Sequence, residues 1–340
     1  MKPFECNATK DSITKVFDLM LENSNLSKMD ISKLTSLSRI TTSKIVDSFH
    51  TASLFKLNHE KAKLGKNRSK VYSLNRSFYF AIYDLSDKNF TLHIYDIKLS
   101  EKYRLEYRYD ENFLIDDNFR AFADESKIII KQYKPYKCLG TCILFPGEYN
   151  ADILSIEHDF FSTLSGIGIQ QIIDSISITD NVLFINKRTA IEKAVAEIIA
   201  PNSSALCFTS FENILYSCTV NKNQNTAAFS SSYIGKNKLS ANITFEEYLE
   251  YQNNNEKLSD KFYNIILELR KYIKLDNIYL FVNSERFTEE LCRLLSINHK
   301  CDSDYNSIQP IYNDDIIKAY IGSFLRNNWL NSIMNNQQVY

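Results

Sequence analysis

The chain lacks the features that would direct it into a membrane. No apolar run approaches the roughly 18 residues that a transmembrane helix needs. The opening residues, Met-Lys-Pro-Phe-Glu-Cys, do not begin a signal-peptide core. We therefore expect a cytoplasmic protein without a membrane partner.

Metal-binding and disulfide motifs are also missing. The seven cysteines form an odd set without a CxxC pair, and the five histidines are scattered without the spacing of metal ligands. A lone histidine of this kind is more often a core or surface residue than a catalyst. We interpret the cysteines as reduced, buried side chains and expect neither a disulfide framework nor a metal site.

What the chain does have is the composition of an ordinary folded protein, with 340 residues of which 44% are hydrophobic and 24% charged. This length is enough for two or three compact units. The net charge of -1 is unevenly distributed, because residues 1–75 carry 13 Lys and Arg against 7 Asp and Glu, whereas residues 76–340 carry 27 against 34. A basic head on an acidic body is typical of a protein whose head contacts a polyanion.

Apolar spacing predicts three short helices in the head. The first covers 11–25, and the second has an apolar face of Met29, Ile31 and Leu34. A tight turn follows, and Ser38 can cap a third helix of about a dozen residues. The outward face of this third helix is expected to contact phosphates and base edges in a major groove of DNA. Its residues are Ser38, Arg39, Thr41, Thr42, Ser43 and Lys44.

A basic hairpin follows these helices. Alternating residues predict strands over 54–57 and 71–74, and the segment between them surrounds Gly65. The two strands and their tip would form a wing, which makes this head a winged helix-turn-helix. The wing residues expected to contact DNA are Lys61, Lys63, Lys66, Arg68 and Lys70. The alternative interpretation is a solvated charged loop in an ordinary helical domain.

The sequence after residue 75 predicts two α/β units in series. The first has strands over 78–85, 90–97, 103–109 and 138–145 and a helix within 111–132. This order is typical of a ribonuclease-H-like unit. The second series begins with a strand over 181–185 and a helix over 189–200, followed by strands over 205–210, 214–220, 226–232 and 278–282. Further helices are expected over 245–251, 259–273, 288–296 and 314–327.

The order of these elements and three local strings resemble the transcriptional-repressor branch of the ROK family (repressors, open reading frames, kinases). LSRITTSKIVD (37–47) is similar to that branch's recognition helix, GKNRSKVYSLN (65–75) to its wing, and LGTCILFPG (139–147) to the strand that ends in Pro-Gly ahead of the sugar site. The resemblance covers nearly the whole chain. It implies a multi-domain α/β fold, a winged helix-turn-helix followed by two ribonuclease-H-like lobes of the actin-like ATPase type.

This resemblance also implies domain limits. They are 1–75 for the DNA-binding head, 76–187 for the first lobe, completed by a C-terminal helix over 314–330, and 188–313 for the second lobe.

The kinase chemistry of the family does not carry over to this chain. Glycine-rich turns let backbone N–H groups approach phosphates, but the chain has only seven glycines. In the first phosphate turn Asp84 remains, while Ser86 stands where the family has glycine. The catalytic aspartate matches Lys187, a cation that cannot act as a base at neutral pH.

The family's zinc site is lost as well. Lys236 stands where the family has a zinc-binding histidine, and no cysteine lies between Cys218 and Cys292. We therefore expect no catalytic residue, no metal and no cofactor. Glu148 and Asn186 remain near the expected cleft as candidates for a polar ligand, with turn formation at strand ends as the alternative.

These features predict a sequence-specific transcriptional regulator, a repressor, that binds double-stranded DNA at a palindromic operator. Its body would be an inactive kinase fold that forms a homodimer or higher homo-oligomer and senses a small sugar-like effector. Two alternatives remain open. One is an active ATP-dependent sugar kinase with an accessory head, and the other is an interaction module whose head binds a protein.

Overall fold

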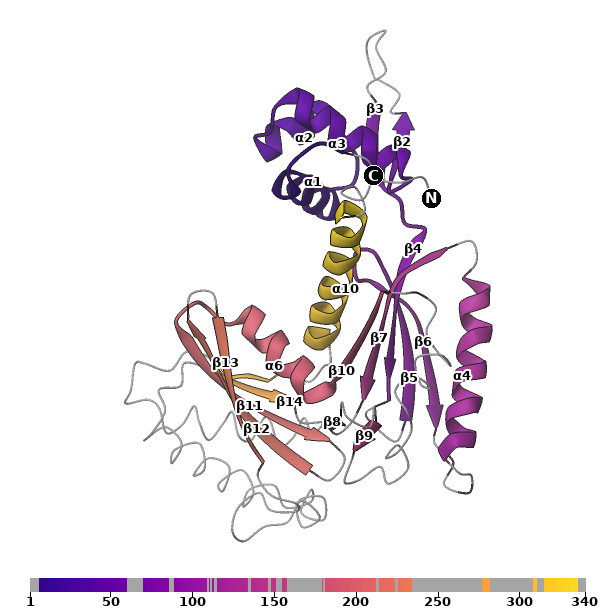
Figure 1. Ribbon diagram of the computed structural model, residues 1–340, viewed down its shortest axis with the longest axis vertical. Helices are drawn as coiled ribbons and strands as arrows, with labels where there is room; N and C mark the ends of the chain where they lie inside the picture. Colours follow the sequence, from indigo (N-terminus) through magenta and orange to yellow (C-terminus); the bar gives the residue numbers. More distant parts are fainter. Residues whose placement is uncertain are drawn as a thin grey trace.

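The computed structural model describes residues 6–59, 70–85, 89–108, 110, 112, 115–133, 136–145, 148–150, 155–157, 179, 181–211, 214–223, 226–233, 277–281, 308–310 and 315–335. Figure 1 shows a small head at one end of the molecule and two sheets below it, with the last helix, α10, running from the head toward the second sheet. None of the helices in these ranges is both long and apolar enough to cross a membrane.

The head contains three helices and a three-stranded sheet, the arrangement of a winged helix. The helices are α1 (Lys10–Glu22), α2 (Lys28–Thr35) and α3 (Arg39–Thr51). The strands are β1 (Leu26–Ser27), β2 (Phe55–His59) and β3 (Lys70–Leu74), in the order β1-β3-β2 with antiparallel pairing. The predicted helices and both predicted wing strands are therefore present.

Side-chain caps begin each helix of the head. Thr9 caps α1, and Ser38 caps α3 as predicted, because its hydroxyl oxygen accepts a hydrogen bond from the Thr41 amide. Ser27 and Asp30 form a capping box at α2. The hydrogen bonds that Asp30 accepts from Ser27 lower the pKa of its carboxyl group. The turn between α2 and α3 places Ser36 at a positive φ of 58°.

The apolar face predicted for α2 is only partly correct. Ile31 is fully buried, but the side chains of Met29 and Leu34 are 50% and 60% exposed. Successive residues of a helix are 100° apart, so Met29, two positions from Ile31, points to the opposite side. The core of the head is instead completed by buried residues of α1 and α3, which are Val16, Phe17, Met20, Ile45, Val46 and Phe49.

The first sheet of the body has the strand order β10-β7-β4-β5-β6. Its strands are β4 (Phe78–Asp84), β5 (Asn89–Asp96), β6 (Glu101–Arg108), β7 (Lys137–Phe145) and β10 (Val182–Asn186). Strands β7 and β10 run parallel to β4, while β5 is antiparallel to both of its neighbours. The strand expected to open the second unit is thus the last strand of the first sheet.

Two helices cover the two faces of this sheet, which explains why every residue of β4 is buried. Alternate residues of β4 point in opposite directions. Phe80 and Ile82 belong to the same apolar cluster as helix α10 (Asp315–Asn335), whereas Tyr79 and Tyr83 join the cluster of α4 (Ile115–Gln132). Helix α10 packs on β4 and β7 of this sheet.

The second sheet repeats the first. Its strand order is β13-β12-β11-β14-β15, with β14 and β15 parallel to β11 and the other pairs antiparallel. The strands are β11 (Ser203–Phe211), β12 (Ile214–Asn223), β13 (Thr226–Tyr233), β14 (Asn277–Phe281) and β15 (Ile308–Pro310). Two sheets with this order and these directions confirm the prediction of two ribonuclease-H-like units.

Helix α6 (Lys187–Ile198) connects the two sheets and packs against α10. A short antiparallel pair, β8 (Glu148–Asn150) with β9 (Ser155–Glu157), follows β7. The helices predicted over 245–251, 259–273 and 288–296 lie outside the described residues.

Candidate functional site

The outward face of α3 carries two exposed cations, Arg39 and Lys44. Between them in the sequence, Ile40 is 72% exposed, which is unusual for a side chain of its size and polarity. Thr41 is half-buried, and its hydroxyl shares a hydrogen bond of 2.9 Å with the hydroxyl of Ser38. The face therefore offers two cations, two hydroxyls and an aliphatic side chain that the sequence analysis did not select.

Thr42 does not lie on this face, which corrects the prediction that it contacts DNA. Its side chain is fully buried, and among the described residues its hydroxyl oxygen has no hydrogen-bond partner. Thr42 is followed three and four positions later by Ile45 and Val46, both fully buried, so it belongs to the inward side of α3.

Ser43 takes part in a network that joins α2 to α3. The ammonium of Lys28 lies 2.6 Å from both carboxylate oxygens of Asp47 and donates to the Ser43 hydroxyl oxygen at 2.8 Å. The same ammonium lies 5.8 Å from the ring centroid of Tyr72 on β3. Lys28 thus neutralises Asp47, the acidic residue of α3, and removes a charge that would repel phosphate. The 19 residues that separate the pair explain why the sequence did not reveal it.

The wing is described only at its base. Strands β2 and β3 pair from Phe55 opposite Leu74 to His59 opposite Lys70, and the side chain of Lys70 is exposed there. The other predicted wing contacts, which are Lys61, Lys63, Lys66 and Arg68, lie outside the described residues.

In the body, Lys187, which the sequence resemblance matches to the catalytic aspartate of the family, forms an ion pair. The ammonium of Lys187, at the start of α6, lies 3.1 Å from a carboxylate oxygen of Asp84, at the end of β4, and the two side chains are only 15% and 11% exposed. Cys142 lies beside them on β7, where burial and then the Asp84 charge raise the pKa of its thiol well above the usual value. The thiol is thus held in its protonated form, and Lys187 and Asp84 offset each other's charge.

Asn186, one of the two candidate ligand residues, caps a helix. The side-chain carbonyl of Asn186 accepts a hydrogen bond from the Thr189 amide at 3.3 Å, which places it at the start of α6 as a cap. This contact is the turn-forming role weighed as the alternative to ligand binding. Glu148 begins β8, but its side chain lies outside the described part of the chain. No group of three or more His, Cys, Asp or Glu in the described ranges could hold a metal ion.

Comparison with known proteins places the fold. No protein-family model and no curated protein matches the chain. The crystal structure of a ROK family transcriptional regulator, a homolog of the E. coli MLC protein, is similar with a TM-score of 0.60 and 12% sequence identity, covering 95% of this chain and 98% of that one. Lower similarity links the chain to the ROK hexokinase from Thermus thermophilus, with a TM-score of 0.46, 10% identity and coverage of 74% and 99%.

The likeness to the regulator extends over head and body together, because it covers nearly all of both chains. The chain therefore has the fold of a ROK family transcriptional regulator, as the sequence predicted. At 12% identity, the shared property is the fold.

Proposed function

We propose that the chain is a sequence-specific DNA-binding transcriptional regulator that acts as a repressor. The observation that carries this proposal is the outward face of α3, where Arg39 and Lys44 are exposed and Asp47, the acidic residue of the helix, is neutralised by Lys28. A helix with cations and short polar groups on its free face can enter a major groove. The excess of cations in residues 1–75 and the fold likeness to a transcriptional regulator support the same function.

The proposal is tested by selecting bound sequences from random duplex DNA and measuring the affinity of the full chain for the selected site in a mobility-shift titration. Arg39→Ala with Lys44→Ala should weaken binding by at least about 100-fold, because each bidentate or charged base contact contributes roughly 1–3 kcal/mol. Unchanged binding by this double variant would overturn the assignment of α3.

Two controls match this experiment. Arg120→Ala with Lys127→Ala removes one Arg and one Lys from exposed positions of α4 and should leave the affinity unchanged. Thr42→Val replaces a buried hydroxyl that lacks a partner in the described structure. This variant should also bind normally, and a loss of affinity would show that Thr42 contacts DNA after all.

The body is proposed to be a catalytically inactive kinase fold that forms a homodimer and binds a sugar-like effector. The pairing of Lys187 with Asp84 supports the inactive state, because it satisfies the carboxylate that remains in the first phosphate turn. Phosphoryl transfer from ATP to a panel of hexoses, followed by ADP release, is the direct test. Turnover that disappears on Lys187→Ala would establish a kinase instead.

The assembly and the limits of its units remain predictions. We expect a palindromic operator in which the body sets the distance between two half-sites. We also expect units of 1–75, 76–187 with 314–330, and 188–313. Sedimentation of the full chain with and without the selected duplex measures the stoichiometry, and a single protomer on one half-site would contradict the dimer.

A further inference from the structure

A cavity of about 270 Å³ lies at the junction of the head and the first sheet of the body. Its walls come from segments that are distant in the sequence: the residues after α1, strands β2 and β3, the chain that leaves the head, and the turn between β5 and β6. The lining residues are Asn23, Ser24, Asn25, Lys56, Ser73, Leu74, Arg76 and Lys98. Neither a predicted DNA contact nor Asp84 or Lys187 is among them.

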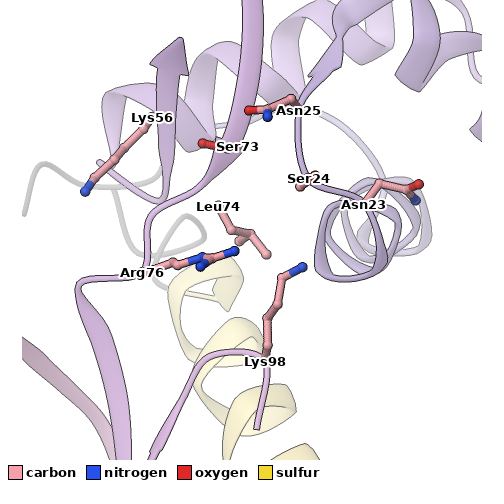
Figure 2. Close-up of a pocket in the computed structure, with 8 residues that line it drawn as sticks. All are labelled: Asn23, Ser24, Asn25, Lys56, Ser73, Leu74, Arg76 and Lys98. Atoms are coloured by element: carbon pink, nitrogen blue, oxygen red, sulfur yellow. The ribbon is translucent and has the colours of Figure 1, made fainter. Parts of the chain in front are cut away.

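Two cations converge in this cavity. Figure 2 shows the side chains of Arg76 and Lys98 on either side of Leu74, while Lys56 points outward from the rim. Asp96, the acid of the β5–β6 turn, is already engaged: it accepts the Lys98 and Ser100 amides and pairs with Lys102 at 2.9 Å. Within the ranges that the structure describes, no carboxylate forms an ion pair with Arg76 or Lys98. Two cations without an acid between them attract an anion.

Two uncharged side chains of the cavity, Asn25 and Ser73, have hydrogens left to donate, whereas Asn23 already donates its side-chain amide to the Leu19 carbonyl oxygen at 2.9 Å. The side-chain amide of Asn58 donates to the Asn25 carbonyl at 2.9 Å and to the Ser73 hydroxyl oxygen at 2.8 Å. These bonds occupy acceptor positions, so the Asn25 amide hydrogens and the Ser73 hydroxyl hydrogen are left to donate to another partner. Donors of this kind, in a cavity that is also lined by a guanidinium and an ammonium, match the oxygens of a phosphate group.

The cavity faces away from the proposed DNA-binding helix. Phe55 on β2 packs on Phe49 of α3, with ring centroids 4.7 Å apart. Lys56, the next residue of β2, is exposed and therefore lies on the opposite face of the sheet, beside its strand partner Ser73. A duplex in contact with α3 would not fill a hollow on the other face. A small molecule of this volume would.

We propose that this junction cavity binds a small phosphate-bearing molecule, held by Arg76 and Lys98 and aided by Asn25 and Ser73. The ligand would join groups of the head to Lys98 of the body and so restrict the angle between them. That the angle matters for DNA binding rests on the proposed function, whereas ligand binding itself does not.

The test is isothermal titration calorimetry of the full chain without DNA, with inorganic phosphate and glycerol 2-phosphate as probes at constant ionic strength. We expect saturable binding at one site, weakened about tenfold by Arg76→Gln and about tenfold by Lys98→Ala. Both side chains are at least partly exposed, so the variants should fold, which circular dichroism checks. Arg120→Ala with Lys127→Ala should bind both probes normally.

Three results would overturn the proposal: no saturable binding, equal binding by Arg76→Gln, or loss of binding in Arg39→Ala with Lys44→Ala, which would assign the anion to α3. If the probe and duplex DNA compete directly for the chain, the cavity is a contact site for the DNA backbone and not a site for a small molecule. Failure of the regulator proposal leaves this titration intact, because it contains no DNA.

Discussion

Two oppositely charged side chains meet in the body, one at the end of β4 and one at the start of α6. The ammonium of Lys187 lies 3.1 Å from a carboxylate oxygen of Asp84, the residue that the sequence resemblance matches to the first phosphate turn. Both side chains are largely withdrawn from water, and each charge is stabilised there by the other. The pair therefore joins the end of β4 to the start of α6.

This interpretation predicts an asymmetric effect of substitution. Lys187→Met should lower the free energy of unfolding by about 3 kcal/mol, because it leaves the Asp84 carboxylate buried without its cation. Adding Asp84→Asn should return the stability to within about 1 kcal/mol of the original chain. Urea denaturation followed by circular dichroism measures both. If the single and double variants are equally unstable, the pair does not act as a unit.

A second residue-scale prediction concerns His93 on β5, whose side chain is only 3% exposed. It contacts Glu101 and Thr91, with Arg104 and Lys318 nearby, and burial, more than any other cause, lowers the pKa of the imidazole. Folding therefore favours neutral His93. Its contribution is complete above the unfolded-state value of about 6.5 and is lost as the pH falls below that value.

Between pH 6.5 and 5.5 the chain should lose stability faster than His93→Gln does, by at most about 1.4 kcal/mol per pH unit for one proton. Urea titrations at several pH values measure the difference between the two slopes. Parallel slopes would mean that His93 does not take up a proton differently in the folded and unfolded states.

Residue-level prediction succeeded where the signal was local. Ser38 was identified as a cap because it immediately precedes an apolar repeat. Thr42 was misplaced because a short polar side chain was assumed to face outward, although its neighbours Ile45 and Val46 define the inward side. The pairs Lys28–Asp47 and Lys187–Asp84 join residues 19 and 103 positions apart, so no local pattern could have revealed them.

At the scale of elements, α10 links the three parts of the chain. It packs on α6 and on β7 and β4, and its Trp329 meets Phe17 of α1 and Phe78 of β4, with ring centroids 6.1 and 6.3 Å apart. Gly322, in the same helix, leaves room for Leu99, which an added Cβ atom would meet at 2.3 Å. The turn that carries Lys98 is thus held against α10.

Trp329→Ala should therefore loosen the head from the body. Deleting a buried indole leaves a cavity and should lower the free energy of unfolding by about 3–5 kcal/mol. Asn328→Ala, at an exposed position of the same helix, is the matched control. Urea denaturation followed by far-ultraviolet circular dichroism compares the two, and an equal stability would show that the Trp329 contacts do not hold the head in place.

The elements themselves were largely predictable, because apolar runs and alternation identify strands that are covered on both faces. The pairing of the strands, and so the sheet to which each strand belongs, was less predictable. Residues 181–185 have the pattern of a buried strand, but whether β10 joins the first or the second sheet depends on pairing with β7, some 40 residues earlier in the chain. The two-residue strand β1 is too short for any periodicity. The last helix extends to Asn335, beyond the predicted end, since its apolar residues continue.

On the scale of the whole molecule, positive charge is concentrated in the head, the part proposed to bind DNA. The net charge is only -1, yet residues 1–75 hold six more cations than anions. We therefore expect the affinity for DNA to depend on the cations of the head and to fall as the salt concentration rises, although the net charge of the whole chain is close to zero. Phosphate contacts contribute affinity without sequence preference, while contacts to base edges contribute the preference itself.

Substitutions in the wing and in α3 should consequently have different signatures. Lys63→Ala with Lys66→Ala should reduce the slope of log affinity against log salt by roughly 2 per bound protomer and weaken all duplexes alike. Arg39→Ala should instead reduce the ratio of operator to random-duplex affinity by about 10-fold or more. Fluorescence anisotropy between 50 and 200 mM salt, with both duplexes, measures slope and ratio together. An unchanged slope in the wing variant would remove the wing from the DNA interface, and the affinity would then have to come from α3 alone.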